Sequence, residues 1–143
     1  MSQQPESGAG SVSKVECVAS VRGRGLAKVA LYRHLAPVTL NALLRVLPLD
    51  SRVNVQPGMV CLFTEIRVGV EKPRTRFAKG DAAFLPSAGL LCIFLREATS
   101  DRPLNPLGSV EDGLPVLEGV RPGEVVSLSL AGSAKPLQAG AQK

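Results

Sequence analysis

One apolar run in this chain is both uninterrupted and bounded by turn residues. Leu90–Leu95 consists only of apolar residues, is too short for an amphipathic helix, and is typical of a strand buried on both faces. A shorter apolar piece, Ala82–Leu85, precedes it, and Pro86–Gly89 supplies a proline-fixed φ and a glycine that tolerates positive φ. The segment therefore predicts a β-hairpin at the centre of a closed or layered sheet.

Further strands are expected on both sides of this hairpin. Two glycines between Lys14–Val21 and Leu26–Tyr32 favour a tight turn, so these segments predict an antiparallel pair. Single strands are predicted at Met59–Phe63, Ile66–Val70 and Val125–Leu130, with a short one at Gly108–Val110. Asp50–Gly58 is interpreted as an irregular polar connection, and residues 97–107, with two prolines, as a polar loop.

One segment has a clear helical pattern. Pro37 suits a first helical turn, and leucines at 40, 43, 44 and 47 fall on one face, so a helix is predicted that ends near Pro48. Its polar side carries Asn41 and Arg45, which predicts a helix that covers one end of the sheet. A second, short helix is expected within Asp112–Glu118.

The length and composition predict one globular domain. The chain has 143 residues, of which 45% are hydrophobic, which suits a single core. Residues 1–13 and 132–143 are rich in Gly, Ser, Gln and Ala and are expected to be flexible tails around a domain at 14–131. No apolar run has the length of a membrane span, and the first residues lack the pattern of a signal peptide, so a cytoplasmic protein without membrane contact is expected.

The residue types that carry most catalytic chemistry are scarce. His34 is the only histidine, so no metal site is expected, and its position before the helix favours a helix-entry or surface residue. The three cysteines lie far apart in apolar stretches, which predicts buried reduced thiols. No glycine-rich loop opens a helix in the manner of a phosphate site, and no cofactor is expected.

The net charge of +5 raises the question of nucleic-acid binding. The densest basic segment surrounds Phe77 and contains Lys72, Arg74, Arg76 and Lys79. It is interpreted as a solvated arm, because four phenylalanines and one tyrosine offer few stacking platforms and the other basic residues are scattered. Nucleic-acid binding through this arm is disfavoured and remains the second alternative.

Arg52 is the candidate functional residue. A guanidinium held between Ser51 and Val53 at a barrel rim could offer its planar fork to a carbonyl or a carboxylate. The alternative is an arginine that fixes its loop by bonding to backbone carbonyls or to Asp50. Sequence alone leaves both open.

The order of these segments resembles the cyclophilin-like proteins of archaea and bacteria. The resemblance covers residues 14–130 and is carried by APVTLNALLRVLP, SRVNVQPGMVCLF, GDAAFLPSAGLLCIFL and LGSVEDGLPVLEGVRPGEVVSL. It implies a mainly β fold, a closed antiparallel barrel of about eight strands with one main capping helix and one short helix.

The resemblance also implies a site around Arg52. True cyclophilins are peptidyl-prolyl isomerases with an arginine in a Phe-His-Arg-Val context, whereas this chain has Asp50-Ser51 before Arg52 and no tryptophan to line a proline pocket. The leading hypothesis is therefore a binding module for a peptide or small ligand, and a prolyl isomerase with Arg52 as its catalytic residue is the alternative. The expected ligand-binding residues are Arg52, Asn54, Gln56, Phe63, Phe84 and Leu91. A homodimer is an open option.

Overall fold

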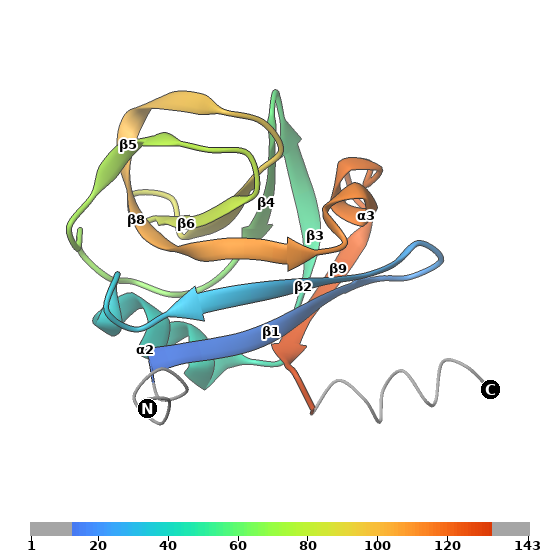
Figure 1. Cartoon of the computed structure of the whole chain (residues 1–143), viewed down its shortest axis with the longest axis horizontal. Coiled ribbons are helices and arrows are strands. Elements are labelled where there is room, and N and C mark those ends of the chain that lie inside the picture. Colours follow the sequence, from blue (N-terminus) through green and yellow to red (C-terminus); the bar gives the residue numbers. More distant parts are fainter. Residues whose placement is uncertain (1–12, 133–143) are drawn as a thin grey trace, which may run out of the picture.

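The computed structural model describes residues 13–132. It is a mainly β structure in which eight antiparallel strands close into a barrel, with one extra strand and two helices (Figure 1). The fold class predicted from the sequence is confirmed. Residues 1–12 and 133–143, which make up nearly all of the two expected tails, lie outside the described residues. The elements are β1 (Lys14–Val21), β2 (Gly25–Tyr32), α2 (Pro37–Val46), β3 (Leu49–Gln56), β4 (Met59–Phe63), β5 (Arg74–Phe77), β6 (Asp81–Leu85), β7 (Leu90–Phe94), β8 (Ala98–Asp112), α3 (Leu114–Glu118) and β9 (Val125–Leu130).

The barrel closes where the long strand β8 meets β2. The strands follow the order β2, β1, β9, β3, β4, β7, β6 and β8, and β8 then pairs with β2. Leu31 faces Gly108 across this seam. A Cβ at Gly108 would overlap the carbonyl oxygen of Ala30, so the two strands can approach this closely only because residue 108 is a glycine. The seam removes the sheet edges that an open sheet would expose.

Alternation along the strands creates two separate apolar clusters. The larger one fills the barrel, and its members on β7 are Leu91 and Ile93. The alternate residues of β7 point outward into a second cluster, in which Cys92 and Phe94 pack with Phe77 of β5. Figure 1 shows β5 and β8 curving around this side of the barrel. The strands β4, β7 and β6 are therefore covered on both faces, as the apolar run at 90–95 predicts.

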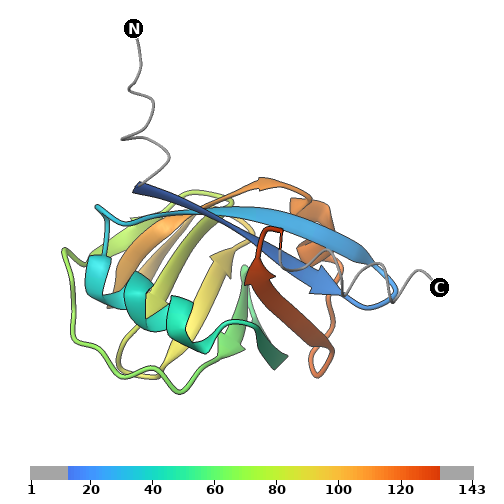
Figure 2. The same cartoon turned by 90° about the horizontal axis from the view of Figure 1, so that it is seen from below.

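The helices lie on opposite sides of the barrel (Figures 1 and 2). Helix α2 runs across one end and buries Leu40 and Leu43 in the barrel core, while Asn41 and Arg45 face solvent as predicted. Helix α3 is a single turn that lies within the expected segment, and it buries Leu117. Neither helix in the described part of the chain is long and apolar enough to cross a membrane.

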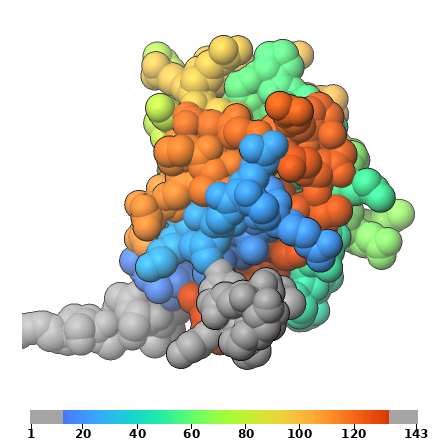
Figure 3. All heavy atoms as spheres, turned by 90° about the vertical axis from the view of Figure 1, so that its right-hand side faces the viewer, coloured from blue at the N-terminus to red at the C-terminus, as the bar shows by residue number. Residues whose placement is uncertain are grey.

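The hairpin of β1 and β2 extends to the turn before β9. Figure 3 shows the blue tip of this hairpin beside the orange-red segment that joins α3 to β9. Arg24 at the tip forms an ion pair with Glu124, with Nε 3.0 Å from Oε1. Glu124 also accepts a 2.7 Å hydrogen bond from the backbone N–H of Arg121, so one carboxylate ties the hairpin to the turn.

One predicted connection is a strand. Asp50–Gly58 was expected to be irregular, but β3 spans most of it and pairs with both β4 and β9. Ser51 and Val53 are buried, and the alternate residues Asp50 and Arg52 are exposed. The prediction was wrong because the polar side of a half-exposed strand was taken for a loop.

Two further predictions are corrected near the second cluster. The expected polar loop at 97–107 forms the first part of β8, whose prolines fall at irregular positions of the pairing with β5 and β6. Conversely, Ile66–Val70 is not a strand, and residues 64–73 run as an irregular segment from β4 towards β5. Within the basic arm at 71–79, only β5 pairs, and it pairs with β8.

Candidate functional site

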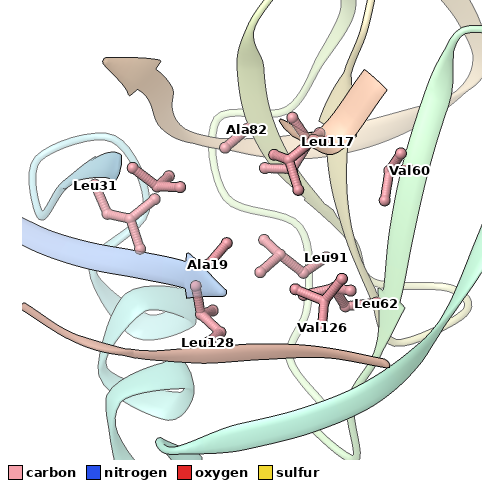
Figure 4. A pocket seen from close by; sticks show the side chains of 11 residues that line it. Ala19, Leu31, Val60, Leu62, Ala82, Leu91, Leu117, Val126 and Leu128 are labelled. Carbon is pink, nitrogen blue, oxygen red and sulfur yellow. The ribbon is translucent and has the colours of Figure 1, made fainter. Parts of the chain in front are cut away.

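The inside of the barrel is filled by side chains. A cavity of about 10 Å³ remains, lined entirely by apolar residues such as Val60, Leu91 and Leu128 (Figure 4). A single water molecule needs about 10–15 Å³ of such space. The described barrel is therefore a packed core, and any larger ligand must bind on the outside.

Three of the predicted ligand-binding residues lie on the outer face of one strand. Arg52, Asn54 and Gln56 alternate along β3 with Val53 and Val55, which pack into the barrel core. Arg52 is exposed, and the two amide side chains are half-buried. Strand alternation therefore aligns one guanidinium and two amides on the same surface.

Phe63 completes this surface from the neighbouring strand. The pairing of β3 with β4 ends at Val53 and Leu62, and Arg52 and Phe63 are the next residues beyond this pair on the two strands. Phe63 is 52% exposed, which is unusual for a phenylalanine in a barrel strand. We refer to Arg52, Asn54, Gln56 and Phe63 together as the outer β3–β4 face.

Arg52 is held at one point by a neighbouring turn. Its Nη1 donates to the carbonyl oxygen of Gly123 at 3.2 Å. That turn is fixed in place because Val53 donates to the carbonyl of Glu124 and accepts from the N–H of Gly123. This contact matches the alternative interpretation of Arg52 from the sequence, in which the arginine bonds to a backbone carbonyl. The guanidinium has further N–H groups, and the structure gives them no partner within residues 13–132.

The other two predicted residues lie elsewhere. Phe84 and Leu91 pair directly across β6 and β7, and both point into the barrel with 1% and 2% exposure. They belong to the barrel core and do not form walls beside Arg52. The expectation placed them near Arg52 because a sequence does not show which side of an apolar strand faces the interior.

A groove begins where the outer β3–β4 face ends. Residues 64–68 form one wall and Pro86–Gly89, the turn between β6 and β7, forms the other, and together they enclose about 680 Å³. Thr64 joins the walls, because its N–H and its Oγ1 both donate to the carbonyl of Gly89, at 3.0 and 2.8 Å. Ile66 anchors the irregular wall in the barrel core. The groove was not predicted, because residues 66–70 were expected to form a strand.

A buried hydrogen-bond network fixes the far end of the irregular segment. The fully buried amide of Asn105 donates from Nδ2 to the carbonyl of Gly69 at 2.9 Å and accepts from the N–H of Glu71 at 2.7 Å. The same Nδ2 donates to Oγ1 of Thr39 at 3.0 Å, and that hydroxyl donates to Glu71 Oε1 at 2.7 Å. These residues come from three distant parts of the chain, so no sequence pattern could reveal the network.

Glu71 also caps helix α2. Its carboxylate accepts from the backbone N–H groups of Val38 and Thr39, at 3.0 and 2.7 Å, where the helix has no side-chain cap of its own. Partial burial opposes ionisation, but the hydrogen bonds from Thr39 and Val38 and the charge of Lys72 outweigh it. The pKa of the Glu71 carboxyl is therefore lowered.

The basic arm lies beside a second, smaller hollow. This hollow of about 200 Å³ is lined by Tyr32, Leu35, Arg74, Phe77, Asp81, Ala82, Pro106, Gly108 and Ser109. Arg74 and Arg76 are exposed. Lys72 donates to the carbonyl of His34 at 3.1 Å and Lys79 pairs with Glu118 at 3.6 Å, so two of the four cations of the arm already have partners.

Metal-binding chemistry has no support in the described residues. Between residues 13 and 132, no group of three or more His, Cys, Asp or Glu side chains is placed to hold a metal ion. His34 is exposed, and its ring lies 5.8 Å from that of Tyr32, in keeping with its interpretation as a surface residue at the helix entry.

Comparisons with known proteins give a fold and no function. No family model matches the chain, and no curated protein matches it. A solution structure of a hypothetical protein from Archaeoglobus fulgidus is similar to it, with a TM-score of 0.68 and 22% sequence identity. The similarity covers 83% of this chain and 96% of the other. At this identity the likeness extends to the fold alone.

Proposed function

We propose that this protein is a binding module for extended peptides, which lie across the outer β3–β4 face and continue into the groove at 64–68 and 86–89. The observation that carries the proposal is the alignment of Arg52 and Phe63 on one accessible surface, next to that groove. The proposal uses four of the six residues selected from the sequence and leaves out the two that lie in the barrel core.

The chemistry of this face suits a peptide backbone. The free N–H groups of Arg52 match a carbonyl or a terminal carboxylate, and the amides of Asn54 and Gln56 can both donate to and accept from peptide bonds. Phe63 offers an exposed aromatic ring to an apolar or proline side chain. Aromatic residues and arginine are the residue types that dominate binding energy at interfaces.

The shape of the surface favours an extended ligand over a compact one. Small-molecule sites are usually enclosed and mostly apolar, but the barrel interior has no room for such a ligand. The groove, by contrast, is open and mixes the charged Glu65 and Arg67 with Pro86 and Val68. A peptide can use these contacts in sequence, whereas a compact ligand reaches few of them at once.

A titration with a capped Ala-Ala-Pro-Phe peptide tests the proposal. We expect amide shifts in the NMR spectrum to change along β3 and β4 and at the two walls of the groove. Arg52→Ala and Phe63→Ser should each weaken binding about tenfold, which corresponds to about 1.4 kcal/mol. Arg45→Ala, which removes an exposed arginine from helix α2, should leave the affinity unchanged.

The peptide length separates this proposal from binding of a small ligand. A dipeptide should bind much more weakly than the tetrapeptide, because it cannot reach both the face and the groove. Equal affinity of the two would indicate a compact ligand. No shift with any peptide at millimolar concentration, or shifts confined to another surface, would refute the proposal.

Prolyl isomerisation is the second candidate for the same surface. The observation that favours it is the exposed Arg52 beside an aromatic ring, since isomerisation needs only a tighter grip on the twisted imide than on the planar one. A protease-coupled assay on the same peptide decides it. Acceleration that disappears in Arg52→Ala would support an enzyme, and acceleration unchanged by that substitution would remove the hypothesis.

Binding of nucleic acid through the basic arm predicts a different result. Affinity for a single-stranded oligonucleotide should then fall steeply with added salt, because phosphate contacts release counterions. With Lys72 and Lys79 already in contact with the protein, we expect weak binding at most.

A further inference from the structure

We infer that Cys61 and Cys92 form a two-electron oxidation site, a dithiol that hydrogen peroxide converts to a cross-strand disulfide. The Sγ atoms of the two side chains lie 3.2 Å apart. Both cysteines are free in the structure and fully buried, in the cluster outside the barrel wall. The inference does not rest on the proposed peptide binding, although Cys61 pairs with Asn54 of the outer β3–β4 face.

The strand register places the two residues at a position where a disulfide fits. Cys61 pairs directly with Cys92 on antiparallel strands. Backbone bonds join Thr64 to Gly89 and Leu95 to Gly58, so hydrogen-bonded pairs lie three positions away on either side. Because the two kinds of pair alternate, the cysteine pair is of the non-hydrogen-bonded kind, with Cα atoms about 4.5 Å apart. Disulfides span Cα distances of about 4.4–6.8 Å.

The two sulfurs are in direct contact. The Cys61 thiol donates a hydrogen bond to the Cys92 sulfur at 3.2 Å. When one thiol loses its proton, the other can hydrogen-bond to the resulting thiolate, which favours that ionisation. Either sulfur can therefore act as the nucleophile, and the other then resolves the intermediate.

The oxidation balances in two steps. The thiolate of one cysteine attacks one peroxide oxygen, the O–O bond breaks, and with one proton taken up the products are a sulfenic acid and water. The sulfur of the other cysteine then attacks the oxidised sulfur, a second water leaves, and the disulfide forms. Each sulfur loses one electron, and the peroxide gains the two.

Local opening of the arm that covers the cysteine pair would expose it to peroxide. The cover consists of β5 and the first part of β8, and it is attached through Phe77, whose ring stacks on Phe94 with centroids 4.7 Å apart. β5 has four residues and pairs with β8 alone. Short two-stranded segments are marginally stable, so this arm is expected to open locally more readily than the barrel.

The third cysteine provides an internal control. Cys17 is buried in the barrel core, and burial raises the pKa of its thiol to about 11. Trypsin would release the three cysteines in separate peptides, residues 15–22, 53–67 and 80–96, because each is bounded by Lys or Arg. Mass spectrometry can therefore assign any link.

The experiment treats the full chain with hydrogen peroxide, blocks the remaining thiols after unfolding, and measures intact mass and tryptic peptides. We expect a loss of two hydrogens per chain, a linked pair of the peptides 53–67 and 80–96, and a free Cys17. Cys92→Ser and Cys61→Ser should each prevent the link, and the cysteine that remains should give a sulfenic acid that a dimedone probe captures. Phe77→Ala should speed disulfide formation several-fold if the arm controls access.

Three results would overturn the inference: no linked peptide at peroxide levels that oxidise a free thiol, links only between different chains, or modification of Cys17 at the same rate as the pair. Should a serine variant fail to fold, the wild-type peptide map still decides. Peptide binding by the reduced protein does not depend on this chemistry, so failure here leaves the proposed function untouched.

Discussion

Glu71 shows how much of this fold depends on single contacts between distant residues. Its carboxylate caps helix α2, and its backbone N–H bonds to Asn105 in the middle of β8. One residue thus fixes the helix and the irregular segment that carries one wall of the groove. Capping interactions of this kind are worth about 1 kcal/mol.

Substitution of this carboxylate should reduce stability in a pH-dependent way. Glu71→Gln is expected to lower the free energy of unfolding by about 1 kcal/mol at neutral pH, because a neutral amide is a weaker acceptor for helix N–H groups. The pKa of Glu71 is lowered in the folded protein, so its contribution is present above its unfolded pKa of about 4.3 and is lost as the pH falls through the folded value. Urea unfolding at pH 7 and near pH 3 should therefore show the wild type and the variant converging in acid.

Glu97→Gln is the matched control for this prediction. Glu97 is exposed and has no hydrogen bond or ion pair within residues 13–132. Its substitution should change stability by less than about 0.5 kcal/mol at either pH. A stability difference between wild type and Glu71→Gln that stays constant down to pH 3 would contradict the titration of Glu71 as its cause.

At the scale of elements, Gly108 sets the distance between β2 and β8. Gly108→Ala would force the new methyl group into the backbone of Ala30, and since backbone atoms cannot move aside as a side chain can, the seam must separate. We expect a loss of more than about 3 kcal/mol, or failure to fold, detected by circular dichroism and urea unfolding.

Gly69→Ala serves as the comparison, because a Cβ at that exposed glycine meets no atom within 4 Å. It should be nearly neutral. Similar losses in both variants would mean that the β2–β8 contact is not the cause.

The arm of β5 and the first part of β8 should exchange its amide hydrogens faster than the barrel. β5 pairs along one edge only, and Phe77 is its buried side chain. β4 and β7 are paired on both edges and covered on both faces. Hydrogen exchange followed by NMR should give protection factors at least tenfold lower for the paired amides of β5 than for those of β7. Equal protection would show that the arm opens only with global unfolding.

The sequence predicts an element well when the pattern that determines it lies within the segment itself. The β6–β7 hairpin and helix α2 have patterns contained within the segment, and both were predicted correctly. The strand β3 and the first part of β8 take their strand structure from partners far away in sequence, and their polar or proline residues resemble a loop. Ile66 is buried as a strand residue would be, but it lies in an irregular segment that crosses to the core.

The same limit applies to the residues selected for the candidate site. Arg52, Asn54, Gln56 and Phe63 were selected from the sequence, and they share a face because alternation on a strand keeps such residues together. Phe84 and Leu91 were selected with them, but they lie on the inner side of the barrel wall. An apolar run shows no alternation, so its inner and outer sides were indistinguishable. The cysteine pair is a third case, since residues 31 positions apart become neighbours only through the register of β4 and β7.

At the scale of the whole molecule, the barrel wall separates stability from binding. The interior is packed and holds the largest apolar cluster, and the proposed peptide surface uses side chains that point the other way. Substitutions on the inner side of the wall should therefore reduce stability, and substitutions on the outer side should reduce peptide binding. This should hold even where the residues lie on neighbouring strands.

Leu91→Ala and Arg52→Ala test this separation as a pair. Leu91 is 2% exposed and lines the small interior cavity, so its truncation should enlarge that cavity and cost about 2–5 kcal/mol of stability. At a temperature where the variant remains folded, its affinity for the Ala-Ala-Pro-Phe peptide should stay within about twofold of the wild type, well under 1 kcal/mol. Arg52→Ala should do the reverse, with weaker binding and a stability change of at most about 1 kcal/mol from the lost bond to Gly123. If Leu91→Ala weakens binding as much as Arg52→Ala does, the ligand reaches the interior and the outer β3–β4 face is not the binding surface.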